Sequence, residues 1–205
     1  MIEIKPYRYE SFFEKIPFLE NKKLLDVAAG CLCDYALFGY LSCLHKQNTQ
    51  KRKVLDGLSN SDIDYMDNII AMDLEYGHKI DSCIPERSLC ADAQNMPFGN
   101  KIFDIVAIGY LLDLLLDSEV ESVVRECARV LKPDGYLVGD VLLHPETLHV
   151  GSDLHICLKP EHELEQLRYK NIIELNGLKI LDANIGYNSQ ILEKSLLFYF
   201  IAQKS

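Results

Sequence analysis

The sequence predicts one α/β domain with a seven-stranded, mostly parallel sheet, helices on both faces and an antiparallel C-terminal hairpin. Three observations lead to this fold class. Short apolar segments of strand length recur along the 205 residues and often end in small or acidic residues. Helical patterns separate several of these segments, which is typical of parallel strands joined by crossover helices. The last two segments have no helix between them, which indicates an antiparallel pair at one edge of the sheet.

The strands are predicted from apolar runs that are bounded by turn residues or charges. In the first run, residues 23–30, Lys-Leu-Leu-Asp-Val gives way to Ala-Ala-Gly, as in a buried strand followed by a tight turn. The second and third runs each end in an aspartate. The predicted strands are residues 23–30 with the turn, 68–73, 87–92, 102–109, 136–141, 178–183 and 195–202.

The helices are predicted from apolar residues at a spacing of three or four. A short helix lies within an N-terminal segment of about residues 1–20, and Pro17 ends its pattern. Further helices are expected over 33–45, 117–131 and 160–175, with a helical insertion at about 46–67. We expect all of residues 1–205 to form a single domain, because a chain of this length has room for one full-sized domain.

Composition excludes several classes of function. The hydrophobic fraction is 48% and the charged fraction 25%, as in an ordinary globular domain. The net charge of −10 disfavours nucleic acid as a partner, since phosphate backbones bind positive surfaces. Residues 105–116 and 191–202, the longest apolar stretches, are too short to span a bilayer. Seven cysteines without repeated spacing favour reduced thiols and a cytoplasmic location.

Acidic residues at successive strand ends predict a nucleoside pocket. Ligands of open parallel sheets bind at the carboxyl ends of the strands. The small residues after Asp26 allow close backbone approach, and Asp73 can accept two hydrogen bonds from a ribose diol. Asp92 can accept from an exocyclic amine, while the amide of Ala93 donates to a ring nitrogen. Taken singly, each aspartate also fits a solvated loop residue.

Two longer blocks resemble a known family. Residues 92–106, Asp-Ala-Gln-Asn-Met-Pro-Phe through Phe-Asp-Ile-Val, are similar to the "D-A-x-x-x-P-F-x-x-x-x-F-D-x-V" stretch of class I S-adenosylmethionine-dependent methyltransferases. Residues 125–137 resemble the same family's "E-x-x-R-V-L-K-P-G-G-x-L", and residues 24–30 resemble its first motif. The likeness covers about residues 22–140 and is greatest to the ubiquinone and menaquinone biosynthesis branch. It implies a Rossmann-like fold.

The resemblance implies roles for residues at matching positions. S-adenosylmethionine would be the cofactor and S-adenosylhomocysteine the product. Asp26, Ala28 and Gly30 would line its methionine end, Asp73 with Leu74 the ribose, and Asp92 with Ala93 the adenine. Gly109 and Tyr110 would border the sulfonium and the acceptor, which makes Tyr110 a candidate catalytic residue as well.

The first motif departs from the family pattern D-x-G-x-G-x-G. Only Gly30 remains of the three glycines, with Ala28 and Leu32 at the flanking positions. Alanine costs little at a turn if its φ is negative, but leucine would be strained where φ must be positive. Either the loop is therefore reshaped or cofactor affinity is reduced. The ribose acid is also open between Asp73 and Asp56. We prefer Asp73, because the 19 residues from it to Asp92 leave room for one short crossover.

The acceptor side is predicted from the N-terminal segment and from the loop after the fifth strand. Tyr7 and Tyr9 are candidates for a lid over the acceptor, as the family resemblance suggests. His144 is a candidate general base, with Glu146 beside it as a substrate contact. A substrate-shaping loop with incidental histidines explains the same residues equally well. We expect no metal site, because the spacing of the histidines matches no strong zinc pattern.

These observations predict S-adenosylmethionine-dependent methyl transfer to a small molecule by in-line displacement, without nucleic acid or a membrane span. One alternative is an enzyme of the same fold and cofactor that catalyses cyclisation or elimination. Another is a non-catalytic binding subunit, which the loss of the flanking glycines favours. A nicotinamide-dependent reductase is disfavoured, because the first turn lacks G-x-G-x-x-G.

Overall fold

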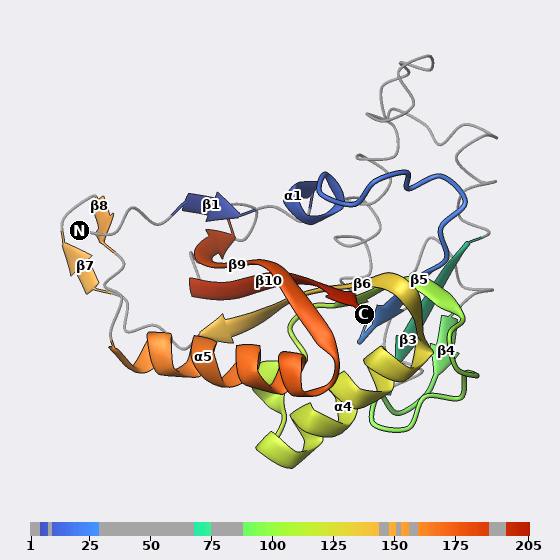
Figure 1. Ribbon diagram of the computed structural model, residues 1–205. Coiled ribbons are helices and arrows are strands. Elements are labelled where there is room, and N and C mark those ends of the chain that lie inside the picture. The colour runs from blue at the N-terminus through green and yellow to red at the C-terminus, as the bar shows by residue number, and fades with distance from the viewer. Residues whose placement is uncertain are drawn as a thin grey trace.

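The computed structural model describes residues 5–7, 10–28, 68–74, 88–143, 148–150, 153–155, 160–188 and 196–205 (Figure 1). The described helices are α1 (Glu10–Phe13), the short 3-10 helix η3 (Leu112–Leu114), α4 (Asp117–Val130) and α5 (Pro160–Leu175). The strands are β1 (Lys5–Tyr7), β2 (Leu24–Val27), β3 (Ile69–Asp73), β4 (Ser88–Cys90), β5 (Phe103–Ile108), β6 (Leu131–Leu143), β7 (Leu148–Val150), β8 (Asp153–His155), β9 (Leu178–Asn188) and β10 (Leu196–Lys204).

The main sheet confirms the predicted mostly parallel architecture. Its strand order is β1-β9-β10-β6-β5-β2-β3-β4. The strands from β6 to β4 pair in parallel, and β10 runs antiparallel to both β6 and β9. The seven predicted strands are all present, and β1 joins as an eighth by pairing in parallel with the end of β9. The C-terminal hairpin therefore has β10 inside the sheet and β9 towards its edge.

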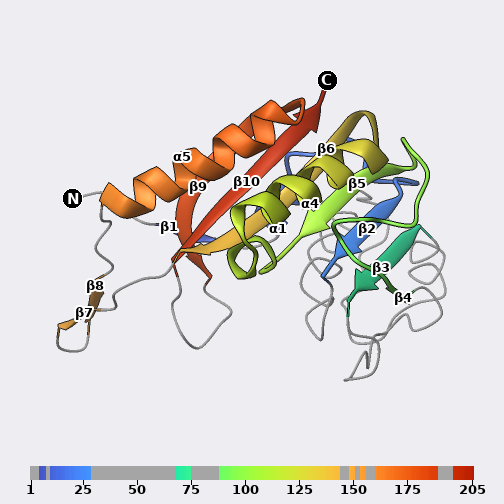
Figure 2. The ribbon, with the colours of Figure 1, turned by 90° about the horizontal axis from the view of Figure 1, so that it is seen from below.

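Alternating side chains along the strands divide the core into two layers. Leu24 faces a cluster that includes Phe12 and Phe13 from the α1 segment, whereas Leu25 faces the cluster under α4 and α5. In Figure 1, α1 lies above the sheet and α4 and α5 lie below it. Figure 2, seen from below, shows α4 and α5 in front of the strands. Phe13 is fully buried, so its role is to pack the α1 segment against the sheet.

The helix α4 matches its sequence pattern closely. Its apolar stripe is buried against the sheet, and the Glu119 side chain accepts a hydrogen bond from the Leu116 N–H at 2.8 Å before the first turn. At the other end, Lys204 Nζ of β10 donates to the carbonyls of Ala128 and Leu131. A cation at this end also complements the helix dipole, so the last strand fixes where α4 stops.

A carboxylate ties three strands together at the amino-terminal edge of the sheet. Asp104 Oδ2 accepts from the Lys23 backbone N–H at 2.9 Å and from Lys132 Nζ at 2.7 Å. Partial burial raises the pKa of Asp104, but these hydrogen bonds outweigh it and hold the pKa below its ordinary value. The contacts join the starts of β2, β5 and β6.

The loop after β6 contains a feature that the sequence pattern did not indicate. The strands β7 and β8 form a separate antiparallel pair, with His149 opposite Leu154 and Leu148 opposite His155. The predicted helix over 33–45 and the predicted insertion over 46–67 lie outside the described residues. Within the described part of the chain, no helix combines the length and the apolar character needed to cross a membrane.

Candidate functional site

The carboxyl ends of five parallel strands meet at one edge of the sheet. Because β4, β3, β2, β5 and β6 are neighbours running in the same direction, the residues that follow them gather there. The gathered residues are Ala28 after β2, Asp73 and Leu74 at the end of β3, residues 91–94 after β4, Gly109 and Tyr110 after β5, and Asp140 near the end of β6. This edge is where an open α/β sheet binds ligands.

A pocket opens at this edge beside β2, β3 and β4. Five of the predicted cofactor residues line it together, namely Ala28, Asp73, Leu74, Asp92 and Ala93. Apolar side chains of Met72, Leu111, Leu115 and Val123 complete much of its wall. An apolar slot with a few carboxylates at its rim suits a flat heterocycle attached to a polyol, as a nucleoside is. The structure thus unites residues that lie far apart in the sequence.

The loop after β4 presents Asp92 to the pocket in a defined turn. Strand β4 ends at Cys90, two residues before the predicted boundary at Asp92. Asp92 Oδ1 accepts from the Gln94 N–H at 2.8 Å, and the Asp92 carbonyl accepts from the Asn95 N–H at 3.0 Å. Ala91 N–H donates to the carbonyl of Asp73 at 2.9 Å, which fixes the start of the loop against β3. Asp92 itself is exposed and available to a ligand.

A buried carboxyl group underlies the site. Asp26 is 6% exposed and lies on the α1 face of β2. Burial raises the pKa of Asp26 well above its ordinary range, and the charges of Asp73 and Asp140 raise it further. A cationic ligand placed here would reverse part of this effect, because it would offset the repulsion among the three carboxylates. The electrostatics of the site therefore favour a ligand with positive charge.

The turn after β5 is held in an unusual conformation by Asp140. Tyr110 has a φ of 50°, in the left-handed region that few non-glycine residues adopt. Its backbone N–H donates to Asp140 Oδ1 at 3.0 Å, and Asp140 is fully buried. The Tyr110 side chain packs against the α1 side of the core. Strained residues of this kind concentrate at ligand sites.

Sequence reasoning did not single out Asp140. Its signal was present, since it is an acidic residue near the end of an otherwise apolar strand. The sequence did not indicate that Asp140 contacts Tyr110, because the two residues are 30 positions apart in the chain. Only the pairing of β5 with β6 brings the Tyr110 amide and this carboxylate together.

The turn after β2 shows which backbone conformation Ala28 adopts where the family pattern has a glycine. Ala28 has a φ of 58°, in the left-handed region that glycine adopts without strain. The expectation that alanine costs little at this turn applied to a negative φ, so it does not hold here. The turn therefore keeps a glycine-like backbone at the cost of strain at Ala28.

Other predicted site residues are not brought to the pocket by the described structure. Gly109 and Tyr110 follow β5 beside the pocket but do not line it. Tyr7 lies in β1, where it pairs with Asn188 of β9. The remaining candidates, Tyr9, Gly30, Asp56, His144 and Glu146, lie outside the described residues.

Comparisons with known proteins agree with this geometry. Residues 57–139 match the family model of a methyltransferase domain. A segment of 49 residues is 47% identical to a demethylmenaquinone methyltransferase of Corynebacterium urealyticum. That segment spans 24% of this chain and only 20% of the curated relative. The family match includes Asp73, Asp92 and Tyr110 and leaves out the first strand with Asp26.

Solved structures share the fold at low sequence identity. A methyltransferase from Mesorhizobium loti has a TM-score of 0.60 at 11% identity, covering 95% of this chain and 96% of that one. The [4+2]-cyclase SpnF has a TM-score of 0.58 at 16% identity, covering 96% and 79%. The 1,6-didemethyltoxoflavin-N1-methyltransferase of Burkholderia thailandensis, solved with bound 1,6-didemethyltoxoflavin and S-adenosylhomocysteine, has a TM-score of 0.54 at 11% identity, covering 90% and 71%. The fold predicted from the sequence is thereby confirmed.

Proposed function

We propose that this chain is a class I S-adenosylmethionine-dependent methyltransferase and that it methylates a small molecule by in-line displacement. The family match over residues 57–139 and the fold shared with a solved methyltransferase support this assignment. The observation that carries the proposal is the pocket at the carboxyl ends of β2, β3 and β4. It brings Asp73, Leu74, Asp92 and Ala93 together as the family resemblance requires. The whole activity is a proposal about this chain, since the curated relative is matched over a fifth of its length.

Each pocket residue has a distinct role towards the cofactor. Asp73, at the end of β3, is placed to accept hydrogen bonds from the ribose hydroxyls. Asp92 and the Ala93 amide would bind the edge of the adenine, between the apolar side chains of Met72 and Val123. Leu74, largely exposed at the rim, would cover the ribose from the solvent side.

The acidic floor would hold the charged end of the cofactor. S-adenosylmethionine supplies a methyl group that is already activated on a positively charged sulfur. Burial raises the pKa of Asp26, and repulsion from the charges of Asp73 and Asp140 raises it further. The cationic cofactor would relieve this repulsion, and neutral-sulfur S-adenosylhomocysteine would relieve it less. The residues therefore favour both binding of the substrate form and release of the product form.

Acceptor recognition is proposed for the α1 side of the site. Tyr110 is held there by its bond to Asp140 and would position the acceptor for attack on the methyl carbon, which shifts the S–CH3 electron pair onto sulfur. His144 would remove a proton where the acceptor has one to lose, with Glu146, Tyr7 and Tyr9 as further acceptor contacts. Gly30 would complete the methionine end. The toxoflavin-type enzyme among the structural neighbours supports a small molecule as acceptor.

A second candidate function keeps the cofactor and changes the reaction. One structural neighbour that covers 96% of this chain is a [4+2]-cyclase, so this fold also carries chemistry other than methylation. The strained turn at Ala28 favours the remaining alternative, a binding subunit with weakened cofactor affinity.

We also propose a cytoplasmic location, on the cysteine content of the sequence and the free thiols of Cys90 and Cys127.

Calorimetric titration with S-adenosylmethionine and S-adenosylhomocysteine tests the cofactor site. We expect binding by the wild-type protein and a loss of about tenfold or more in each of Asp73→Ala and Asp92→Ala, because each removes hydrogen-bond acceptors from the ligand. Asp134→Ala is the matched control, since Asp134 lies near the start of β6 and does not line the pocket. Asp56→Ala tests the alternative ribose acid.

The outcomes separate the candidate functions. A folded wild-type protein that binds neither ligand would contradict the methyltransferase assignment and favour the binding subunit. Loss of binding in Asp56→Ala but not in Asp73→Ala would reassign the ribose contact. Release of S-adenosylhomocysteine in an acceptor screen supports methyl transfer, whereas acceptor conversion without that release supports the non-methylating alternative.

A further inference from the structure

We propose that Glu126 and Arg129 of α4 form a positioning pair that holds the loop after β4 in place and so sets the affinity for the adenosine part of the cofactor. The loop consists of residues 91–102, of which the first four line the pocket. The inference rests on the proposed function, because it names the residues that shape one end of the same site. Neither residue lines the pocket itself.

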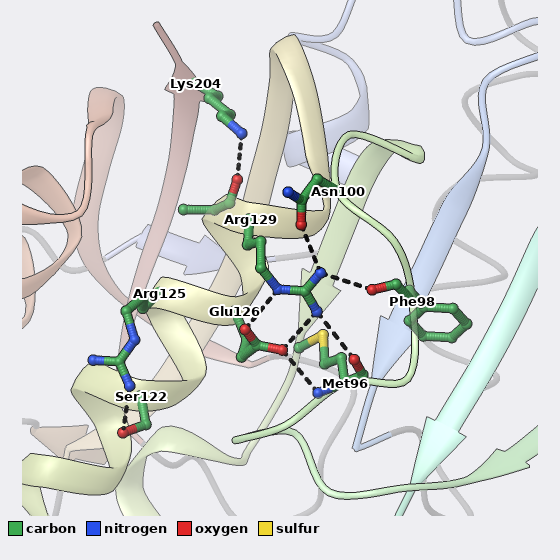
Figure 3. A network of polar contacts seen from close by, with 9 residues as sticks. Met96, Phe98, Asn100, Ser122, Arg125, Glu126, Arg129 and Lys204 are labelled. Carbon is green, nitrogen blue, oxygen red and sulfur yellow. Dashed lines mark hydrogen bonds and ion pairs between the residues drawn. The ribbon is translucent and has the colours of Figure 1, made fainter.

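Arg129 uses its whole guanidinium group on this loop and on Glu126 (Figure 3). Nη1 donates to the Phe98 carbonyl at 2.7 Å and to Asn100 Oδ1 at 2.9 Å. Nη2 donates to the Met96 carbonyl at 3.0 Å and to Glu126 Oε2 at 2.7 Å, and Nε donates to Glu126 Oε1 at 2.7 Å. A guanidinium has five N–H donors, so these five bonds account for all of them.

Glu126 also binds the loop, because its carboxylate accepts a hydrogen bond from the loop backbone. Its Oε2 also accepts from the Met96 backbone N–H at 2.8 Å, so the N–H and the carbonyl of Met96 are both held by α4. The bond from Arg129 lowers the pKa of Glu126 below its ordinary value. The two charges neutralise each other, and both carboxylate oxygens are occupied. The pair is therefore arranged for holding the loop and not for contact with a charged ligand.

The geometry connects this attachment to the pocket wall. Val123, which lines the pocket, lies one helical turn before Glu126 on the same face of α4. The Met96 side chain is buried in the core below, and the Phe98 ring packs edge-on against Phe103 at 5.0 Å between centroids. The same face of α4 thus contributes Val123 to the apolar wall of the pocket and, through Glu126 and Arg129, holds the loop whose residues 91–94 line the pocket.

The two ends of the loop are fixed independently of the charged pair. Ala91 N–H is bonded to Asp73, and Ile102 N–H to the Val130 carbonyl. Between these points, Arg129 contacts three residues of the loop, Met96, Phe98 and Asn100. Loss of the guanidinium should therefore release the middle of the loop without detaching its ends. Asp92 and Ala93, which lie between the fixed end and the released part, would then be held less firmly while the fold persists.

The experiment uses Arg129→Lys and Glu126→Gln with calorimetric titration of three probes, S-adenosylmethionine, S-adenosylhomocysteine and adenosine. Lysine keeps the charge but offers three donors from one point, which cannot span acceptors spread along the loop. We expect about tenfold weaker binding of all three probes by the same factor, because the loop acts on the part that they share. The controls are Arg125→Lys, whose guanidinium contacts Ser122, and Glu121→Gln, which is exposed on the same helix.

Kinetics distinguish positioning from a catalytic or merely structural role. The adenosine end does not react, so KM for S-adenosylmethionine should rise about tenfold while kcat stays near the wild-type value. Asn100→Ala removes a single acceptor and should weaken binding about two- to threefold, which provides a variant that folds if Arg129→Lys does not.

The outcomes separate this inference from the proposed function. If the wild-type protein binds S-adenosylmethionine and neither Arg129→Lys nor Asn100→Ala differs from the Arg125→Lys control, the positioning role is wrong and the proposed function stands. A loss confined to S-adenosylmethionine, with adenosine binding unchanged, also overturns it. A wild-type protein that binds none of the three probes overturns the proposed function, and this inference with it.

Discussion

Two aspartates on adjacent strands of the sheet, Asp104 of β5 and Asp26 of β2, show how differently its two edges are built. At the amino-terminal edge, the Asp104 carboxylate is bonded to Lys132 and to the Lys23 amide, and its pKa is lowered. At the carboxyl-terminal edge, Asp26 is buried near two further carboxylates, and its pKa is raised. The same side chain therefore stabilises the fold at one edge and costs stability at the other.

The different surroundings of Asp104 and Asp26 suit the amino-terminal edge to stabilising the fold and the carboxyl-terminal edge to binding a ligand. A carboxylate that is bonded to a cation needs no ligand, whereas a cluster of like charges gains stability when a cation binds. Positive φ values occur at both edges, at Ala28 and Tyr110 after β2 and β5 and at Lys101 and Asp134 near the starts of β5 and β6. The contrast between the edges therefore rests on their carboxylates and not on backbone strain.

The largest effect on stability is expected from Asp104→Ala. This variant loses a charge-assisted hydrogen bond from Lys132 and leaves the Lys23 N–H without its carboxylate acceptor. We expect a loss of about 2 kcal/mol in the free energy of unfolding, measured in urea near pH 7. Binding of S-adenosylmethionine should be unchanged, because Asp104 is at the opposite edge from the pocket.

The same variant has a pH signature. Since the folded-state pKa of Asp104 lies below its unfolded value, the stabilisation is fully present above pH of about 4 and disappears as the pH falls through the lowered value. The free energies of unfolding of the wild-type protein and Asp104→Ala should therefore become more similar in acid. A difference that stays constant down to pH of about 2 would contradict this account of the amino-terminal edge.

The opposite sign is expected for Asp26→Asn. The folded-state pKa of Asp26 is raised, so in the wild-type protein stability falls as the pH rises from about 4 through the raised value. Asparagine removes the buried charge, and we expect a gain on the order of 1 kcal/mol in urea unfolding at pH 8. The gain should disappear towards pH 4, where the wild-type carboxyl is protonated.

The stabilised Asp26→Asn variant should also bind S-adenosylmethionine more weakly, because one of the carboxylates that favour a cation is gone. Asp140→Asn sharpens the test, since it keeps the oxygen that accepts from Tyr110 and removes only charge. It should lower the pKa of Asp26, measured by NMR titration of the carboxyl carbon. An unchanged pKa would mean that Asp140 does not repel Asp26.

The smallest effect is expected from Ala28→Gly. Glycine removes the strain of a positive φ, which costs about 1–2 kcal/mol for other residues, but gains freedom in the unfolded chain worth about 0.4–1 kcal/mol. The net gain should be about 0.5 kcal/mol in urea unfolding. Ala128→Gly, inside α4, is the control and should lose about 1 kcal/mol. A loss in both variants would show that Ala28 is not strained.

The sequence predicted the elements well wherever local pattern decides structure. The buried stripe of α4, the strands β2, β3 and β5, and the hairpin of β9 and β10 all lie where apolar spacing placed them. It failed where pairing decides, as for β1, whose three residues form a strand only by joining β9. It also set the end of the third strand at Asp92, whereas the turn at Asp92 begins after Cys90.

By itself, the sequence determined the fold class and the order of the strands along the chain, and it singled out Asp73 and Asp92, which the structure places in one pocket, because these follow from periodicity and local motifs. Only the tertiary structure decided which groups meet across long separations. It placed Asp140 under the Tyr110 amide and the Arg129 guanidinium on the loop of Met96 and Phe98. Such contacts depend on strand register and helix packing, which no local pattern encodes, and they set the charge and shape of the site.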